Sequence, residues 1–581
     1  MSRKQKQKEL KTPYWLSSVI LAGSYLLFGL FKEYGACLYT GIWGILFLMK
    51  GSKISRNDRK QAWPVFCCQR PNEIVIGIIA LCYFFNCFYG IDRGMSFIGF
   101  LKFMGVPLFL GYLRLLNNDE KRLLYQMIPI LGCVMTVVGM IGRFIPPLYS
   151  FFYVADRLGG FFQYPNVFAL YCLVGIFLLL EKRKEFAKSC RIQIILLLGG
   201  ILLSGSRTVF FITVFVALLC FWKCADLRKQ IIIFAVVCFG GILIYTGVTG
   251  NVQNIGRFLT TSFTSSTLLG RIIYWKDGLK ELLHHPLGLG YLGYYYREPV
   301  IQTAFYSVRF IHNDFLQLAL DVGMLPALLF AVMYMKMFWD KKLSFERKMA
   351  LLAMLLHFFM DFDLEFVSMW YLLILITDIP GEMQPQSENA YFVKYGMYMK
   401  RVGKAFLGVL AVCGLYTGIS MIPRYLGDAE LTSTLLPYYT ESNVELLSQE
   451  TDPAKAENLA KKICRQNIYI PETYDIFAIL AFQNGDYEKV IQEKEKSLSL
   501  QKYNMEAYEK YAVLLAKGIN IAAENGEENQ VEILMEGVKR IPKLVSEVEN
   551  HTTELAYKTK DSPDFTLSEW LQEFLNEIEK Y

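Results

Sequence analysis

The chain has 581 residues, of which 54% are hydrophobic, 15% are aromatic and only 19% are charged. This composition is typical of a membrane protein and excludes an ordinary soluble domain. The net charge of +7 hides two regions of opposite sign: residues 427–581 contain 29 acidic and 16 basic residues, whereas the first 426 residues carry the basic excess. That excess lies in loops between apolar segments, so it does not indicate binding to nucleic acid. We expect two domains, 1–426 and 427–581.

The first domain contains a series of apolar segments, many of them close to the roughly 20 residues that a membrane-spanning helix needs. They predict an all-α, polytopic membrane bundle of twelve to fourteen spans. The first segment lacks a small-residue cleavage site and is followed by similar segments, so we interpret it as a span and not as a signal peptide. The predicted spans are 14–31, 35–50, 72–90, 95–116, 123–141, 163–180, 191–204, 207–222, 230–248, 312–338, 348–361, 366–379 and 403–422.

Basic residues are unevenly distributed between the loops. Lys and Arg concentrate in the cytoplasmic loops of membrane proteins. Every second loop of this chain carries three to six of them, and the short loops between carry none to two. This pattern predicts a multi-pass protein of the cell membrane with a cytoplasmic N-terminus. It also predicts an extracellular loop at about 249–311 and an extracellular C-terminal domain.

Two shorter turns also face outward in this topology. Gly and Pro residues between 142 and 166 predict an ordered turn that enters the next span. The second turn, Ser204-Gly205-Ser206-Arg207-Thr208, places Arg207 where an apolar hairpin meets the outer surface. An arginine at that depth is costly unless its side chain reaches the interface or binds an anion. Arg207 is therefore a candidate for anion binding, with an interfacial anchor as the alternative.

The longest polar interruption, from Asn251 to Gly323, collects arginines, histidines, glycines and aromatic residues. Guanidinium groups bind pyrophosphate through paired hydrogen bonds and stabilise charge on a leaving phosphate. A histidine with a pKa near neutrality can accept a proton from an attacking hydroxyl. The set therefore suits a metal-free reaction on a phosphate-bearing substrate. The candidate catalytic residues are Arg271 and His312 from this stretch, together with Arg207 from the earlier turn. The candidate substrate contacts are Tyr274, Trp275, Arg297, Arg309, Asn313 and Asp321.

These residues also have structural interpretations. Arg271 would serve as a membrane-surface anchor, and His312 as a helix-capping or core residue. Tyr274 and Trp275 fit an interfacial aromatic belt as well as they fit stacking on sugar rings. The sequence contains no nucleotide-binding loop, serine-hydrolase turn or zinc-protease motif. Its paired cysteines lack companion ligands at zinc spacing, so we expect neither a metal nor a cofactor.

The C-terminal region shows helical patterns. Tyr474–Gln483 and Tyr487–Leu500 are separated by a turn, and a similar unit begins at Asn504. These units resemble tetratricopeptide repeats, which usually form scaffolds or bind partners. We expect an extracellular α-helical domain that offers a surface to a protein partner, and whose removal affects acceptor choice or assembly more than chemistry.

Five segments, in order, resemble the O-antigen ligase and O-antigen polymerase superfamily over about residues 70–380. The resemblance implies a glycosyltransferase of the GT-C type that uses an undecaprenyl-diphosphate-linked glycan and needs no metal. It also implies that Arg207 and Arg271 bind the donor pyrophosphate and that His312 activates the acceptor. Asp321 stands where many members have Glu. The segments are Gly159…Pro165-Asn166, Ser204-x-Ser206-Arg207-Thr208, Gly270-Arg271-x-x-Tyr274-Trp275, His285-Pro286-x-Gly288-x-Gly290 and His312-Asn313-x-x-Leu316…Asp321-x-Gly323.

Two other functions are alternatives to glycan transfer to a saccharide, cell-wall or protein acceptor. A transporter or flippase of lipid-linked glycans would place polar residues at mid-depth in several spans, whereas here they gather in the outer loops. A membrane-anchored scaffold of a polysaccharide assembly complex would need only one anchoring helix. Ligase and polymerase differ in their acceptor, and the sequence is compatible with both.

Overall fold

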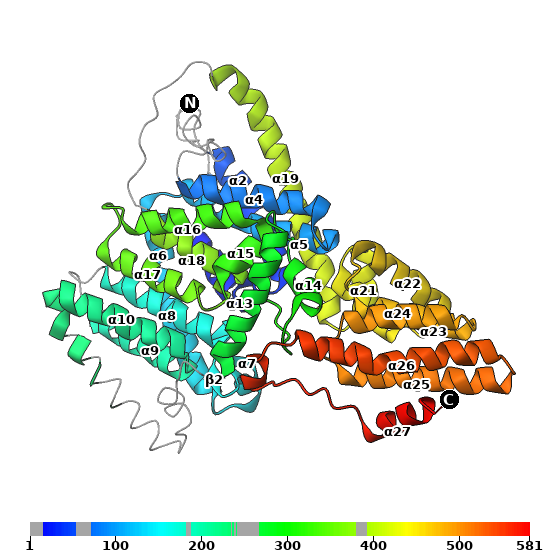
Figure 1. Ribbon diagram of the computed structural model, residues 1–581. Helices are drawn as coiled ribbons and strands as arrows, with labels where there is room; N and C mark the ends of the chain where they lie inside the picture. Colours follow the sequence, from blue (N-terminus) through cyan, green and yellow to red (C-terminus); the bar gives the residue numbers. More distant parts are fainter. Residues whose placement is uncertain are drawn as a thin grey trace. The chain divides into compact units, whose positions relative to one another are not determined.

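The computed structural model describes residues 15–53, 71–181, 188–229, 231–233, 235–236, 240, 266–378 and 392–580. These residues are almost entirely helical (Figure 1). In this part of the chain the strands are β1 (Tyr153–Val154) and β2 (Arg157–Leu158), which pair antiparallel. The predicted all-α class is confirmed. The chain divides into two compact units: the first comprises Met1–Gly77, Lys102–Thr261 and Ala331–Leu415, and the second comprises Ile78–Leu101, Ser262–Phe330 and Tyr416–Tyr581.

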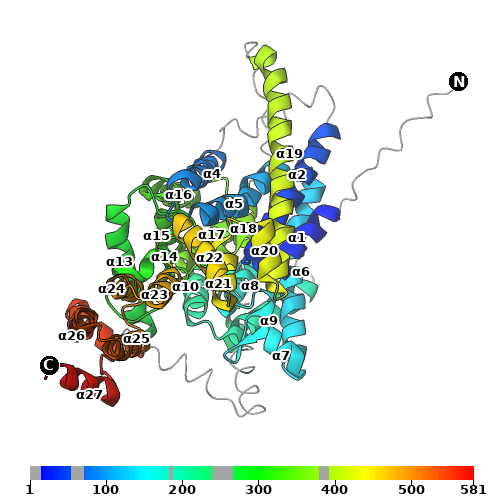
Figure 2. The same cartoon turned by 90° about the vertical axis from the view of Figure 1, so that its right-hand side faces the viewer.

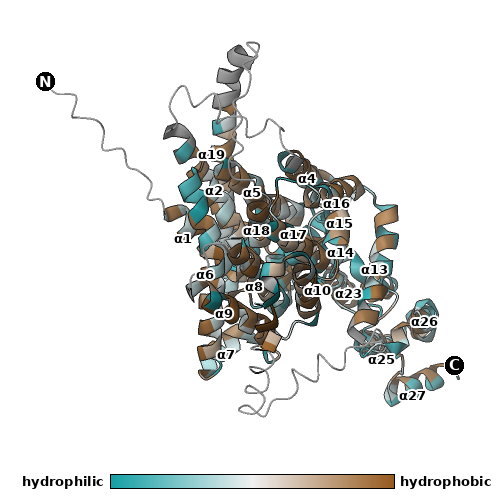
Figure 3. Cartoon of the chain, turned by 90° about the vertical axis from the view of Figure 1, so that its left-hand side faces the viewer, coloured by the Kyte–Doolittle hydropathy of each residue, from teal (hydrophilic) through white to brown (hydrophobic). Residues whose placement is uncertain are grey.

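Apolar helices build the first unit. Helices α8 and α18 are buried on nearly every side, as expected for helices that are hydrophobic all round, and Figure 3 colours both predominantly brown. The helices of this unit are α1 (Leu16–Leu26), η1 (Phe28–Leu30), α2 (Glu33–Lys53), α6 (Asn118–Gly142), α7 (Pro146–Phe152), η2 (Gly160–Phe162), α8 (Pro165–Leu180), α9 (Lys188–Ser204), α10 (Arg207–Lys223), η4 (Ala225–Leu227), α17 (Phe345–Phe358), η5 (Asp363–Glu365) and α18 (Val367–Thr377).

Four helices contribute residues to both units: α4 (Pro71–Tyr89), α5 (Arg93–Arg114), α16 (Met324–Phe338) and α19 (Phe392–Tyr425). The last is the long yellow-green helix of Figure 2. Among the described residues, four stretches are long and apolar enough to span a membrane, namely Asn72–Tyr89, Arg93–Arg114, Asn118–Gly142 and Val402–Tyr425. This finding supports the polytopic class and a membrane location. The higher span count stays a prediction, because the other apolar helices are shorter and most of the predicted span 230–248 lies outside the described residues.

The expectation of one continuous span over 312–338 is wrong. The chain forms α15 (Asp314–Val322) and α16, separated at Gly323, whose φ is +101°. The main chain of Pro286 and Leu287 lies against this break, because a Cβ at position 323 would meet their atoms at 3.0 Å. The Met324 N–H donates to the Pro286 carbonyl at 3.0 Å. Only glycine meets both the positive φ and the close approach.

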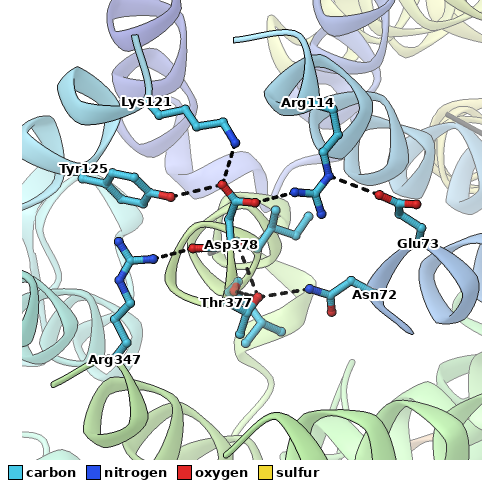
Figure 4. A network of polar contacts seen from close by, with 10 residues as sticks. Asn72, Glu73, Arg114, Lys121, Tyr125, Arg347, Thr377 and Asp378 are labelled. Carbon is cyan, nitrogen blue, oxygen red and sulfur yellow. Dashed lines mark hydrogen bonds and ion pairs between the residues drawn. The ribbon is translucent and has the colours of Figure 1, made fainter. Parts of the chain in front are cut away.

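Helix ends that the charge pattern assigns to the cytoplasmic side meet at one end of the first unit (Figure 4). Asp378, which follows α18, accepts hydrogen bonds from Arg114 at 2.5 Å and from Lys121 at 2.8 Å. Arg347, at the start of α17, donates to the Asp378 carbonyl and pairs with Glu181 at 2.8 Å. Residues that are distant in sequence thus share one polar network. Which side of the membrane these helix ends face stays a prediction.

The second unit combines α13 (Ser266–His284), α14 (Gly293–Ile301) and α15 with the C-terminal helices. Predicted helices at 474–483, 487–500 and from 504 match α23, α24 and α25. Their assignment as tetratricopeptide repeats, and the domain boundary at 427, stay predictions. The C-terminal helices are α20 (Ala429–Leu435), α21 (Thr440–Gln449), α22 (Pro453–Gln466), α23 (Pro471–Gln483), α24 (Tyr487–Ser499), α25 (Met505–Glu524), α26 (Glu528–His551), η6 (Ala556–Lys558) and α27 (Glu569–Ile578).

Within this unit, the first C-terminal helices are anchored on the turn between α4 and α5. The buried carboxylate of Asp92 caps α5 through the Met95 N–H and also accepts hydrogen bonds from Thr440 and Asn467. Burial raises the pKa of Asp92, and its hydrogen bonds oppose that shift. Gly94 is needed because a Cβ there would meet the Tyr438 carbonyl oxygen at 1.9 Å. Residues after 427 therefore pack against an earlier part of the chain and do not form a free appendage.

Candidate functional site

Helix α13 carries three of the predicted residues. Its sequence is amphipathic, with Ile273 and Tyr274 buried and Ile272 exposed. Arg271 and Tyr274 lie three residues apart, so their side chains leave the same face of the helix. The centroid of the Tyr274 ring lies 6.0 Å from that of His312. Arg271 and His312 therefore both neighbour Tyr274.

His312 lies in a firmly held backbone segment. Its φ of +49° is in the left-handed region, which L residues adopt infrequently and at some cost. On one side, the Ile311 N–H donates to the side-chain oxygen of Gln317 at 2.9 Å, and the Trp275 indole N–H donates to the Ile311 carbonyl at 2.9 Å. On the other side, Asn313 caps α15. Trp275 and Asn313 thus fix the main chain on either side of the imidazole.

The His-Pro-x-Gly-x-Gly segment packs along the end of α15. The Leu289 N–H donates to the Leu320 carbonyl at 2.6 Å, and the Gly290 N–H donates to the Asp321 carbonyl at 3.1 Å. A Cβ at Gly288, whose φ is +90°, would meet the Asp321 carbonyl oxygen at 2.6 Å. The glycine spacing is therefore explained by main-chain pairing. Main-chain hydrogen bonds therefore hold this loop against the end of α15.

Asp321 is 1% exposed, and both of its carboxylate oxygens accept hydrogen bonds. Tyr83 donates to one oxygen at 2.9 Å and Gln317 donates to the other at 2.9 Å, while Asn86 donates to the Asp321 carbonyl at 2.6 Å. These three partners of Asp321 were not predicted from the sequence. Gln317 lies four residues before Asp321 on the same helix, so helical spacing gave a signal. Tyr83 and Asn86 lie on α4, and local sequence gives no signal for them.

Arg297 and Arg309 are engaged by carboxylates. Arg297 pairs with Glu281 of α13 at 2.8 Å and donates to the Tyr469 hydroxyl at 2.8 Å. Arg309 pairs with Glu441 of α21 at 2.7 Å. Both guanidinium groups therefore join the 297–311 segment to other parts of the second unit.

Arg207 belongs to the first unit, whereas Arg271 and His312 belong to the second. It is the first residue of α10. The preceding turn is held by Arg157, which donates to the Ser204 carbonyl at 2.8 Å and to the Asn166 side chain at 2.6 Å. Asn166 in turn donates to Asp361 at 2.6 Å. The two turns that the topology places outward therefore meet within the first unit.

The electrostatics of the 293–311 region include one strongly perturbed acid. Glu298, on α14, is 3% exposed and accepts a hydrogen bond from the Val308 N–H at 2.9 Å. Burial raises the pKa of Glu298 to about 8, against the lowering effect of that hydrogen bond. Within the part of the chain that the structure describes, no group of three or more His, Cys, Asp or Glu residues is arranged to hold a metal ion.

A family model described as O-antigen ligase matches residues 192–332. This range contains Arg207, Arg271 and His312, together with the glycine loop between them. The match supports the superfamily predicted from the five sequence segments, and with it membrane glycosyl transfer of the O-antigen ligase type. Neither the curated proteins nor the solved structures provide a match.

Proposed function

We propose that the chain transfers a glycan from an undecaprenyl-diphosphate carrier to a saccharide, cell-wall or protein acceptor, because a family model described as O-antigen ligase matches residues 192–332. An acceptor hydroxyl attacks the anomeric carbon of the carrier-linked sugar. The new glycosidic bond forms as the bond from that carbon to the phosphate oxygen breaks. The acceptor proton passes to a base, and undecaprenyl diphosphate leaves. The observation that carries this proposal is the family match over a segment that contains Arg271, one helical turn from Tyr274, and His312, whose ring lies 6.0 Å from that of Tyr274.

Arg271 and Arg207 are assigned to the donor. A guanidinium group offers two parallel donors to a phosphate and keeps its charge at any physiological pH. It therefore binds the pyrophosphate and stabilises the charge that grows on it as the sugar leaves. Arg271 takes this role within the second unit. Arg207 takes it on the resemblance of its turn to the family motif.

His312 is assigned as the base. A neutral imidazole can accept a proton from an attacking hydroxyl near pH 7. The hydrogen bonds at Ile311 and the helix cap at Asn313 orient the main chain that carries the ring. Tyr274 lies one helical turn from Arg271 and beside the His312 ring, and because it is buried we assign it to positioning these two residues.

The remaining predicted residues are assigned mainly to positioning. Trp275 and Asn313 hold the backbone around His312, and Asp321 ties α15 to α4 through Tyr83. Arg297 and Arg309 bridge the 297–311 segment to Glu281 and Glu441. We propose that these five residues shape the site, with contacts to substrate limited to the face of the Trp275 ring.

The orientation of the chain is part of the proposal. The uneven distribution of basic residues supports a cytoplasmic N-terminus, with the 266–312 region and the C-terminal helices outside the cell. A lipid-linked glycan presented on the outer leaflet would then reach Arg271 and His312 directly.

The proposal is tested by incubating purified protein with an undecaprenyl-diphosphate-linked oligosaccharide and a panel of glycan, peptidoglycan and peptide acceptors. Mass spectrometry should detect an acceptor that has gained the oligosaccharide, with release of an equal amount of undecaprenyl diphosphate. Reconstitution in vesicles separates transfer from transport. Movement of intact donor across the bilayer without any acceptor product would contradict the proposal and favour a flippase.

A further inference from the structure

The C-terminal segment 552–558 packs directly on the helix that carries Arg271. Ala556, which is fully buried, forms a hydrophobic cluster with Ile273 of α13 and with Ala304. Its neighbour Thr553 donates its N–H to the Thr303 carbonyl at 3.0 Å. One short stretch near the C-terminus thus touches both α13 and residues 302–306, which we call the strap.

The strap is fastened to α13 by Asp277, which is 1% exposed. One carboxylate oxygen of Asp277 accepts the Thr303 N–H at 2.8 Å, and the other accepts the Thr303 hydroxyl at 2.9 Å. The Tyr306 hydroxyl donates to the same carboxylate at 2.9 Å. The strap therefore lies between Asp277 on one side and the C-terminal segment on the other.

Other C-terminal residues hold the strap and its flanks. Lys502 donates to the Val300 carbonyl at 3.0 Å, and the ring of Tyr503 lies 6.4 Å from that of Phe305. The ion pair of Arg309 with Glu441 adds a contact after the strap. Contacts from α21, from the turn before α25 and from the 552–558 segment thus converge on residues 297–309.

A continuous series of contacts links the strap to the candidate site. The Tyr306 ring packs edge-on against Tyr274 with 5.6 Å between centroids, and Tyr274 lies 6.0 Å from His312. Tyr274 is one helical turn from Arg271. A displacement of the strap would therefore move the aromatic ring that lies beside His312 and one helical turn from Arg271.

We propose that the 552–558 segment is a positioning element of the transfer site: it holds the strap against α13 and so sets the geometry of Tyr274 relative to Arg271 and His312. The inference rests on the proposed function and deepens it. It differs from the expectation that removing the C-terminal region affects acceptor choice or assembly more than chemistry, which stays untested. Misplacing reacting groups by about 1 Å can cost on the order of 100-fold in rate. Ala556, Thr553, Thr303 and Asp277 are accordingly positioning residues.

Three variants of the full-length protein test the inference. Ala556→Glu places a charge in the buried cluster and should lower kcat by about 10- to 100-fold, with the KM for the donor within about twofold of wild type. Thr303→Val keeps the side-chain volume but removes the hydroxyl that Asp277 accepts, and should lower kcat by about 3- to 10-fold. Thr303→Ser retains the hydroxyl and should recover most of the rate.

Glu506→Gln provides the matched control, because Glu506 is exposed on α25 in an ion pair with Lys510. It should leave both kinetic constants unchanged. The inference is overturned if Ala556→Glu and Thr303→Val turn over at the wild-type rate, or if Thr303→Ser is as slow as Thr303→Val. A general loss of folding would instead lower kcat equally in the Ser and Val variants.

Hydrogen exchange provides a measurement that does not depend on activity. In Ala556→Glu, the amides of α13 and of residues 297–311 should exchange faster than in wild type, whereas Glu506→Gln should leave them unchanged. Unaltered exchange in Ala556→Glu would refute the positioning role whatever the activity. Faster exchange in a protein whose wild type transfers no glycan would refute the proposed function and leave the mechanical link in place.

Discussion

Two groups of basic residues in the same stretch of chain have different surroundings. Arg297 and Arg309 lie 2.8 and 2.7 Å from the carboxylates of Glu281 and Glu441. The Tyr274 ring lies 6.0 Å from that of His312 and one helical turn from Arg271, and the main chain at His312 is held by Trp275 and Gln317. Ion pairs tie Arg297 and Arg309 to other parts of the second unit, whereas Arg271 and His312 lie in the segments that resemble the family motif.

The difference has an energetic consequence. An arginine that is paired with a half-buried or buried carboxylate must break that ion pair before its guanidinium group can bind a pyrophosphate. The carboxylate would then be left unpaired, which costs free energy. The pairs at Arg297 and Arg309 therefore favour structure over substrate binding. Donor binding is assigned to Arg271 because its segment resembles the family motif and lies within the matched range, and each prediction below would break or sharpen the contrast.

The largest expected effect is on the rate of transfer. Replacing His312 or Arg271 with Ala should lower kcat by about 1000-fold, because the first change removes the base and the second removes charge stabilisation at the leaving phosphate. His284→Ala is the matched histidine control, since the His284 ring is exposed at the end of α13, and it should retain a rate within about threefold of wild type. If His284→Ala and His312→Ala lowered kcat equally, His312 would not be the base.

A second effect is on stability at the carboxylate-paired group. Glu281→Ala leaves the Arg297 guanidinium without its main partner in a largely buried position, and should destabilise the protein by about 3 kcal/mol. The apparent Tm of the detergent-solubilised protein measures this change. Adding Arg297→Leu to Glu281→Ala should recover much of the loss, because the unpaired charge is then absent. A double variant less stable than the single one would show that the pair is not the source of the effect.

A third effect depends on pH. The pKa of Glu298 is raised to about 8 in the folded protein, so the folded state holds a proton that the unfolded chain loses above its lower pKa. The stability from this group is complete at acidic pH and is lost as the pH rises through the folded pKa, by on the order of 2 kcal/mol between pH 6 and pH 8. Glu298→Gln stays neutral throughout, so its apparent Tm should fall less over that range. If the apparent Tm of wild type and of Glu298→Gln fell equally between pH 6 and pH 8, the raised pKa of Glu298 would be contradicted.

The smallest expected effect is that of metal removal. Charge stabilisation by arginines requires no divalent ion, and EDTA should change the transfer rate by less than about twofold. If EDTA inhibited transfer and one added metal restored it, a bound cation, and not Arg271, would stabilise the charge on the leaving phosphate.

Sequence patterns predicted the helices that depend on local signals. The ends of α23 and α24 follow from the periodicity of apolar residues and from the Asn484-Gly485-Asp486 turn, where Asp486 caps α24. The break at Gly323 was not predicted, because the apolar run continues through it and the cause lies at Pro286 and Leu287, which come from another part of the chain.

The same limit applies to the candidate site. The motif residues could be recognised because each family motif consists of residues that are close together in the sequence. Their partners were not found, because Tyr83 lies 238 residues from Asp321 and Ala556 reaches Ile273 from the far end of the chain. Long-range contacts of this kind decide whether an arginine is paired and whether a helix is held, and spacing along the sequence does not record them.

The most direct test of the central claim is a comparison of two conservative substitutions, Arg271→Lys and Arg309→Lys, in the initial rate at which purified protein releases undecaprenyl diphosphate in the presence of acceptor. Lysine can keep an ion pair with Glu441 but cannot offer a bidentate fork to a phosphate. The account predicts that Arg271→Lys loses at least about tenfold in rate while Arg309→Lys remains within about twofold of wild type. Equal rates for the two variants, or a greater loss at position 309, would contradict it.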